Sequence, residues 1–301
     1  MEVKRDNAFQ QAIRCLPPLR ASQLAALEEQ ETAEEVRFRA GRPPAVKTMS
    51  GERELPLPPV SADELREILS RAARYSVHSY TESLKHGFIT LTGGHRLGVC
   101  GTAAVENGHV IGVRGLSSLN VRIARQIRAL EAEVASWIST GRPQSVLLVS
   151  PPGYGKTTLL REWVRQVSGQ GRTVAVADER GEIAALSGGV PQFDIGGCTD
   201  VLEGCPKKQA ALMLLKTMSP ELIAFDEITA PEDVEAVSLC AHCGTAVLAS
   251  AHAADVDDLC RRPLYRALLA LQVFDCAVVI EKQDGQRVYR KKGLEDIACS
   301  N

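Results

Sequence analysis

The sequence has few aromatic residues and almost no net charge. Phe, Trp and Tyr account for 4% of the 301 residues, and 35 Lys and Arg are balanced by 37 Asp and Glu, for a formal charge of −2. Proteins that bind single-stranded nucleic acid combine basic grooves with aromatic side chains on which bases stack. This composition is poor in both features, so we expect no nucleic acid partner.

Long hydrophobic runs are missing as well. No apolar stretch approaches the roughly 18 residues of a membrane-spanning helix, and the start of the chain, Met1–Asp6, has no apolar signal-peptide core. We therefore expect a cytoplasmic protein, which would reach a membrane only through a partner.

The nine cysteines do not form a zinc motif. Cys240 and Cys243 are the only close pair, and Cys198 and Cys205 do not supply the second pair that a structural zinc site requires. The close pair also falls at an apolar helical pattern, where cysteine behaves as a small hydrophobic residue. We expect no zinc.

Changes of pattern along the chain indicate two domains and a preceding segment. Residues 1–60 suggest a helical and extended segment that ends near a group of prolines. Residues 61–140 open with a capping box, Ser61–Glu64, and continue as a small α+β domain with a linker helix. Residues 141–301 form the larger domain.

In the larger domain, apolar runs of strand length alternate with helical patterns. We expect strands at Val146–Ser150, Thr173–Asp178, Leu222–Asp226, Thr245–Ser250 and Cys276–Ile280. We expect helices at Thr157–Gln166, Pro206–Met218, Pro231–Cys240 and Val256–Leu271. Continuous Val, Ala, Leu and Ile runs are typical of parallel strands buried on both faces. The order predicts a three-layer α/β fold with a loop for phosphate after its first strand.

The stretch from Val146 to Thr158 indicates a site for a nucleoside triphosphate. An apolar strand runs into a glycine-rich turn that ends in Lys-Thr and is followed by a helix. Glycine lets several backbone N–H groups point at a phosphate, Lys156 would lie between the β- and γ-phosphates, and Thr157 would offer its hydroxyl to Mg²⁺. The residues expected to bind ATP are Ser150, Pro151, Pro152, Gly153, Tyr154, Gly155, Lys156, Thr157 and Thr158.

A second strand ends in two carboxylates. In Leu222–Glu227, four apolar residues precede Asp226 and Glu227, which is the Walker B pattern. We expect Asp226 to face Mg²⁺ together with Thr157, and Glu227 to orient and deprotonate the attacking water.

Further polar groups follow other strands of this domain. Asp178, Glu179 and Glu182 come after the second strand and could tune Mg²⁺ or the water, although a salt bridge to Arg180 is an alternative role. His252 follows an apolar strand and is placed to sense the γ-phosphate, or else is structural. The carboxyl ends of strands are where ligands bind in open α/β sheets.

These motifs, together with Gly189–Asp194, Thr199–Lys207, Ala73–Tyr80 and Ser117–Arg125, resemble the stage III sporulation protein AA family. That family is similar to the traffic ATPases of type II and type IV secretion systems. The resemblance implies an α/β fold, a RecA-like P-loop NTPase core with a smaller N-terminal α+β domain, in a hexameric ring. Two positions depart from the patterns: Ser150 replaces the first glycine of the phosphate loop, and Asp-Glu-Arg replaces the usual Glu-Asp-Pro of the acidic box.

The resemblance also implies roles and partners. Catalysis would use Lys156, Glu227, His252 and the acidic box with Glu179 and Glu182. ATP and Mg²⁺ are the implied substrate and cofactor. In such rings a neighbouring domain supplies arginines to the γ-phosphate; the matching region here holds Arg122 and Arg125, with Arg114 as a third candidate.

The implied setting is the mother-cell cytoplasm, with recruitment to the septal or forespore membrane by membrane components of a sporulation channel. The motor would energise that channel. Two alternatives stay open: a RecA-like motor driven by nucleic acid, and a nucleotide-gated scaffold with negligible hydrolysis.

Overall fold

The computed structural model describes residues 8–73, 87–106, 108–126, 132–139, 141–283 and 286–293. Its chain forms two compact units: Met1–Arg125 with Ser187–Gln192, and Gln126–Leu186 with Phe193–Asn301. Most of the motif Ala73–Tyr80 and part of the expected linker helix lie outside the described residues. Among the helices described, none has the length and apolarity that a membrane span requires.

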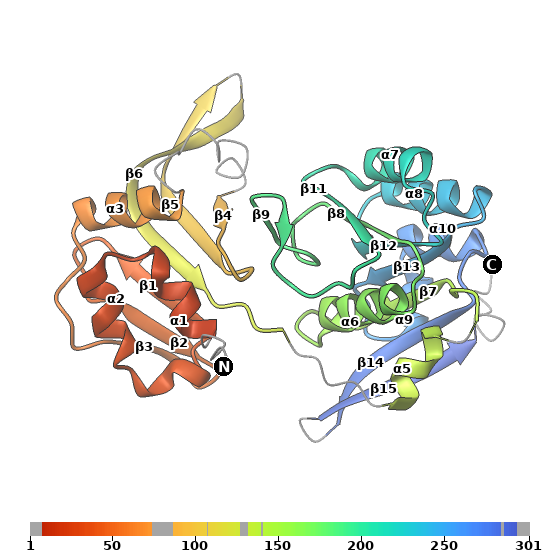
Figure 1. Ribbon diagram of the computed structural model, residues 1–301, viewed down its shortest axis with the longest axis horizontal. Coiled ribbons are helices and arrows are strands. Elements are labelled where there is room, and N and C mark those ends of the chain that lie inside the picture. The colour runs from red at the N-terminus through yellow and green to blue at the C-terminus, as the bar shows by residue number, and fades with distance from the viewer. Residues whose placement is uncertain are drawn as a thin grey trace. The chain divides into compact units, whose positions relative to one another are not determined.

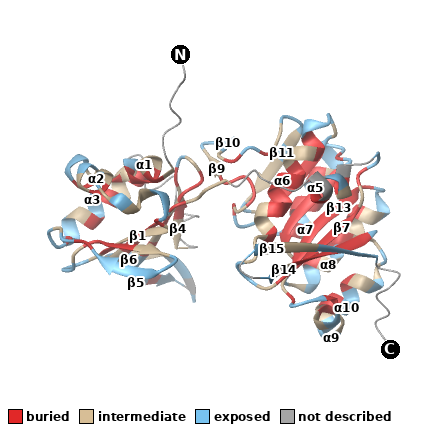
Figure 2. Cartoon of the chain, turned by 90° about the horizontal axis from the view of Figure 1, so that it is seen from below, coloured by how far each residue is buried: buried red, intermediate tan, exposed pale blue. Residues whose placement is uncertain are grey.

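The N-terminal unit is a six-stranded antiparallel sheet with helices on one face (Figures 1 and 2). The strand order is β3-β2-β1-β6-β5-β4. The strands are β1 (Glu35–Arg39), β2 (Ala45–Thr48), β3 (Gly51–Glu54), β4 (Phe88–Thr90), β5 (Arg96–Glu106) and β6 (His109–Arg122). The helices are α1 (Ala8–Ala12), α2 (Pro18–Ala25) and α3 (Ala62–Ala72), with 3-10 turns η1 (Ile13–Cys15) and η2 (Glu28–Glu31).

One core joins the parts of this unit. Phe9 of α1, Phe38 of β1 and Leu65 of α3 are fully buried in the same apolar cluster. Strand β1 also pairs along its whole length with β6, with Val36 opposite Val121. Residues on both sides of position 60 therefore belong to one unit, whereas the sequence pattern suggested a boundary between 1–60 and 61–140. The difference arises because this pairing joins strands about 85 residues apart, which no local pattern reports.

The second unit is built on a seven-stranded sheet of order β11-β8-β12-β13-β7-β14-β15. All neighbours pair in parallel except the antiparallel hairpin β14–β15. The strands are β7 (Val146–Val149), β8 (Val174–Asp178), β11 (Thr199–Glu203), β12 (Leu222–Glu227), β13 (Ala246–Ala251), β14 (Cys276–Gln283) and β15 (Gln286–Gly293). The five expected strands are confirmed. The edge strands β11 and β15 were not expected, because they are polar and half-exposed.

Helices cover both faces of this sheet, as the predicted three-layer architecture requires. They are α5 (Ala132–Ser139), α6 (Lys156–Gly169), α7 (Lys207–Thr217), α8 (Pro231–His242), α9 (Val256–Arg261) and α10 (Pro263–Ala270). Alternate residues of β7 face opposite layers: Leu148 packs with Trp163 of α6, and Leu147 packs in the cluster that α7 to α10 complete. Figure 2 shows the central strands buried throughout. The helix expected over Val256–Leu271 is interrupted at Arg262, directly before Pro263, which starts α10.

A short two-stranded ribbon interrupts the second unit between β8 and β11. It consists of β9 (Leu186–Ser187) and β10 (Val190–Pro191). Within the N-terminal unit, Gln192 accepts a hydrogen bond of 2.7 Å from the backbone N–H of Gly93. The segment Ser187–Gln192 therefore belongs to the N-terminal unit, although the residues before and after it belong to the second unit.

Candidate active site

The glycine-rich turn connects the end of β7 to the start of α6. Gly153 and Gly155 have φ angles of +77° and +99°, a left-handed region that other residues rarely adopt. Helix α6 begins at Lys156, immediately after this turn. The first N–H groups of a helix have no partner within it, so the turn and the helix together present donors suited to an anion.

Lys156 is folded back onto the turn. Its ammonium group donates to the carbonyl oxygens of Ser150 at 2.7 Å and Pro151 at 3.1 Å, and to the Ser150 hydroxyl at 3.3 Å. Burial lowers the pKa of Lys156 to about 8, while Glu227 and Asp226 act in the opposite direction. The departure at Ser150 thus has a local role, because the hydroxyl that replaces glycine contacts this ammonium.

Thr157 and Asp226 come together from α6 and β12. The Thr157 hydroxyl donates to Oδ1 of Asp226 at 3.4 Å. Asp226 is buried, and its pKa is raised to about 7, first by this desolvation and then by the negative charges of Glu182 and Asp178 and a hydrogen bond with the Glu182 side chain. The site therefore holds two carboxylates in contact, Asp226 and Glu182, with a third close by, an arrangement that a cation stabilises.

The three acids that follow β8 have different surroundings. Asp178 is fully buried, and its carboxylate accepts backbone N–H groups of Glu182, Ile183 and Ala184 at 2.8 to 3.2 Å. Glu179 instead forms an ion pair of 2.6 Å with the buried Lys207. Of the two expected glutamates, the structure brings Glu182 to Asp226, and Asp178 fixes the loop that carries it.

Arg161 supports the same loop and was not singled out from the sequence. Its guanidinium is buried and donates to the carbonyls of Glu182 at 2.6 Å and Ile183 at 2.8 Å. It also stacks 3.8 Å from the centre of the Phe193 ring. Burial lowers its pKa to about 10, against the attraction of Asp178, Asp226 and Glu182. No local signal could have assigned it, since its position two turns into α6 is an ordinary helical one.

Glu227 and His252 meet at the ends of β12 and β13. Oε1 of Glu227 lies 2.7 Å from Nδ1 of His252, and Oε2 lies 3.3 Å from the guanidinium of Arg180. The Tyr265 hydroxyl accepts the backbone N–H of His252 at 3.1 Å and donates to the carbonyl of Ile228 at 3.2 Å. The Tyr265 hydroxyl, on α10, thus bridges the backbone just after β12 and just after β13. Its role was not predicted from the sequence.

Desolvation and the positive charge of Lys156 lower the pKa of His252, against the attraction of Glu227. A neutral imidazole beside Glu227 can hold a carboxylate or a water in place without adding a charge. Together these side chains offer a cation, a carboxylate base and hydroxyl and carboxylate oxygens at one edge of the sheet.

The arginines expected to act between subunits lie in the N-terminal unit. Arg122, at the end of β6, is exposed, and so is Arg114. Arg125 is half-buried, and its guanidinium donates to the carbonyls of Ala33 at 2.6 Å and Gln30 at 2.8 Å. Arg125 therefore stabilises the backbone of its own unit, whereas the charge of Arg122 is at the surface.

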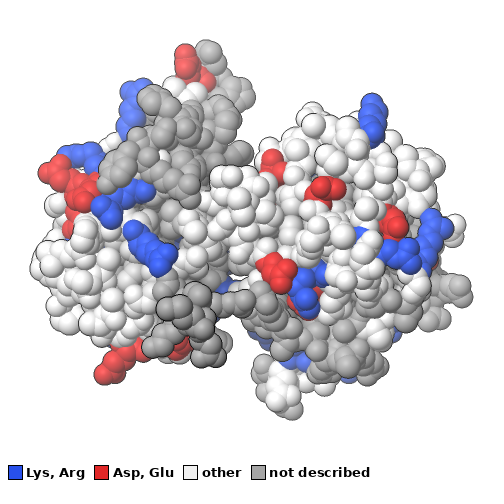
Figure 3. Space-filling model, in the orientation of Figure 1, with Lys and Arg blue, Asp and Glu red and all other residues white. Residues whose placement is uncertain are grey.

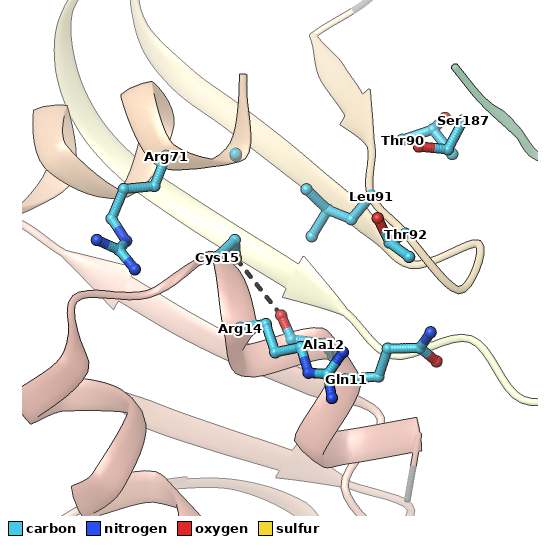
Figure 4. Close-up of a pocket in the computed structure, with 10 residues that line it drawn as sticks. Gln11, Ala12, Arg14, Cys15, Arg71, Thr90, Leu91, Thr92 and Ser187 are labelled. Atoms are coloured by element: carbon cyan, nitrogen blue, oxygen red, sulfur yellow. Dashed lines mark hydrogen bonds between the residues drawn. The ribbon is translucent and has the colours of Figure 1, made fainter. Parts of the chain in front are cut away.

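The N-terminal unit also contains a pocket of about 180 Å³ that no predicted site residue lines (Figure 4). Gln11, Arg14, Arg71 and Thr92 contribute to its walls, and the Cys15 thiol points to the carbonyl of Ala12 at 3.4 Å. Burial raises the pKa of Cys15 to about 12. The thiol therefore stays protonated, which is unsuited to a nucleophile.

Solved structures share the fold. The X-ray structure of the ATPase DotB of Legionella pneumophila superposes with a TM-score of 0.60, at 15% identity over 92% of this chain and 81% of that one. The crystal structure of the pilus retraction motor PilT with bound ADP gives 0.54, at 16% identity over 86% and 78%. The fold is therefore the expected one, a RecA-like P-loop core with a smaller N-terminal α+β domain.

Sequence comparison gives the family. The family model described as sporulation stage III, protein AA matches residues 10–295. The stage III sporulation protein AA of Bacillus subtilis (strain 168) is 35% identical over 298 residues, which cover 92% of this chain and 94% of that protein. The chain belongs to the sporulation stage III, protein AA family.

Proposed function

We propose that this chain hydrolyses ATP as a motor of the secretion traffic ATPase type. The proposal rests on one observation: Lys156, Asp226 and Glu227 lie close together at one edge of the sheet. The negative charges of both carboxylates stabilise the Lys156 ammonium there. A phosphate chain bound by the turn would replace the loop carbonyls that now accept from Lys156. Phosphoryl transfer depends on positioning and charge stabilisation, which these groups supply.

The residues present fit a magnesium ion. Thr157 and Asp226 would hold it, because a hydroxyl and a carboxylate oxygen 3.4 Å apart are hard ligands of the kind that Mg²⁺ prefers. The contact between Glu182 and Asp226 supports the same assignment, because a cation stabilises two neighbouring carboxylates. When bound, Mg²⁺ would neutralise charge on the β- and γ-phosphates.

Glu227 is the proposed base for the attacking water. Its carboxylate is held from two sides, by His252 at 2.7 Å and Arg180 at 3.3 Å, so that it has a fixed direction. His252 would place the water and respond to the γ-phosphate. Glu182 is the acidic-box residue that we propose acts at the site, because Glu179 is engaged by Lys207.

We propose that the working form is a homo-hexamer in which Arg122 reaches the nucleotide of a neighbouring subunit. Arg122 is exposed, whereas Arg125 is bound to backbone carbonyls of its own unit. The hexamer would energise the sporulation channel between mother cell and forespore, recruited from the mother-cell cytoplasm by membrane components of that channel.

Among the alternatives, a motor driven by nucleic acid receives little support from the surface. On the face drawn in Figure 3, Lys and Arg side chains are interspersed with Asp and Glu over the described residues. An ATPase rate that single-stranded DNA stimulates in a salt-sensitive manner would favour that alternative instead.

The test is ATP turnover by purified protein and by Glu227→Gln. We expect Glu227→Gln to lower kcat by roughly 100-fold or more, the usual contribution of a general base, with ATP still bound. Glu232→Gln, at an exposed position of α8, is the matched control and should behave as the wild type. Equal kcat values for Glu227→Gln and wild type would refute the assigned base.

Assembly is tested in the same assay. Because an arginine supplied by a neighbour requires contact between subunits, specific activity should rise with protein concentration in step with the oligomer mass. A fully assembled ring that binds ATP and does not turn it over would instead show the nucleotide-gated scaffold.

A further inference from the structure

The antiparallel hairpin β14–β15 carries two cations on one face. Lys282 and Arg287 are directly opposite each other in its ladder, and side chains of opposed residues point to the same side of a sheet. Tyr289, two residues along β15, packs on the apolar cluster under α6. The shared face of Lys282, Arg287 and Tyr289 is therefore the one turned toward α6 and the phosphate-binding turn.

Both cations reach that turn. A Cβ atom built on Gly155 would lie 2.9 Å from Cζ and 3.1 Å from Nε of Arg287. The ammonium of Lys282 lies 4.8 Å from the centre of the Tyr154 ring. The guanidinium of Arg287 thus lies against Gly155, the glycine directly before Lys156 in the phosphate-binding turn.

Among the described residues, neither charge has a counter-ion. Like charges placed opposite each other in a ladder repel, and in the described chain no carboxylate or carbonyl pairs with Arg287 or Lys282. The neighbouring cation Arg290 shows the contrast, because it pairs with Glu281 at 3.1 Å. Two cations without a carboxylate partner among the described residues, next to a turn suited to anions, favour an anionic ligand at this place.

We propose that Arg287, with the help of Lys282, binds the phosphate chain of the nucleotide that the turn of the same subunit holds. The inference rests on the proposed function, since it assigns a second wall to that site. The turn would hold the phosphates by N–H groups and Lys156 from one side, and the hairpin would hold them by a guanidinium from the other. Arg287 acts within one chain, whereas the proposed Arg122 contact needs a neighbour.

The experiment measures dissociation constants of a fluorescent ADP analogue, and of ATP, ADP and inorganic tripolyphosphate as competitors, with the full chain. Arg287→Gln should weaken all of them by roughly 10- to 100-fold, as expected for loss of a hydrogen bond to a charged group. Arg287→Lys, which keeps the charge, should weaken them less. Arg290→Gln, on the same strand and paired with Glu281, is the matched control and should leave them unchanged.

The outcomes separate the two proposals. If wild type binds the nucleotides, Lys156→Ala abolishes binding and Arg287→Gln changes no constant by more than twofold, the hairpin proposal falls and the ATP site stands. If Arg287→Gln weakens ATP and leaves tripolyphosphate unchanged, Arg287 contacts the base or sugar, and the phosphate proposal is overturned. If wild type binds neither ATP nor tripolyphosphate, both proposals fall. Melting temperatures of each variant without nucleotide confirm that Arg287→Gln is folded.

Discussion

The stability of the N-terminal unit should depend on pH through His95. This side chain follows the turn after β4 and is 1% exposed. Its Nδ1 accepts the backbone N–H of Ala124 at 3.0 Å, while Nε2 has no hydrogen-bond partner in the described chain. Gln11 of α1 approaches the same turn at Gly93. The accepting Nδ1 requires a neutral ring with its proton on Nε2.

The magnitude follows from the burial of this ring. Desolvation lowers the pKa of His95 from 6.5 to about 4, and the charge of Arg125 contributes. Between these pH values the unfolded chain binds a proton that the folded unit does not bind, so the stabilisation is complete above pH 6.5 and is lost as pH falls toward 4. At about 1.4 kcal/mol per pKa unit, the loss in the free energy of unfolding is about 3 kcal/mol.

The assay compares urea unfolding of wild type and His95→Asn from pH 7 to pH 4. Asparagine keeps an acceptor for the Ala124 N–H and cannot be protonated in this range, so the variant should lack this part of the pH dependence. His242→Asn, at an exposed position of α8, is the matched control. If His95→Asn and wild type lose stability in parallel over this interval, the buried neutral histidine is the wrong explanation.

Two further predictions concern groups that hold the site. Asp178→Ala leaves three loop N–H groups without their acceptor and should lower the free energy of unfolding by about 3 kcal/mol or more. Urea unfolding measures this loss, with Asp200→Ala at an exposed position as the control. A loss below about 1 kcal/mol would contradict the anchoring role of Asp178. Tyr265→Phe removes the hydroxyl between His252 and Ile228 and should cost about 1 to 2 kcal/mol of stability. Its kcat should fall with an unchanged KM for ATP, and an unchanged kcat would show that this hydroxyl does not position His252.

The parts of the site that the sequence predicted are those that one continuous segment defines. The strand, turn and helix around Lys156 follow from local rules, and so does the buried strand that ends at Asp226 and Glu227. The contacts of Glu182 and Glu179 could not be predicted in the same way. Both acids follow β8 within five residues, and only the positions of Asp226 and Lys207 in space distinguish them.

Roles that depend on distant partners were also missed or left open. Arg122 and Arg125 are the same residue type three positions apart, yet only Arg125 donates to carbonyls of a segment about 90 residues earlier, among the contacts of the described chain. Tyr265 lies in an amphipathic helix where a buried tyrosine is ordinary core. Its hydroxyl matters because it lies between two strand ends, and no spacing in the sequence records that.

The order of the strands explains which of these groups meet. Ends of neighbouring parallel strands are about 5 Å apart, so a side chain that follows one strand readily reaches the end of the strand beside it. Strand β12 lies between β8 and β13. The acid that follows β8 therefore meets Asp226, and the histidine that follows β13 meets Glu227.

The same rule extends to the other side of the sheet. Strand β7, which leads into the phosphate-binding turn, lies between β13 and β14. Its turn thus lies between the side chains proposed for catalysis, which follow β12 and β13, and the β14–β15 hairpin with Arg287. The order of these strands along the chain, β7, β8, β12, β13, β14, does not predict this arrangement. The first of them, β7, lies between β13 and β14 in the middle of the sheet. Substitutions at Arg287 and Glu227 should therefore act independently, one on affinity and the other on turnover, and their effects on kcat/KM should multiply in the double variant. A double variant no worse than Glu227→Gln alone would show that the two flanks act as one unit.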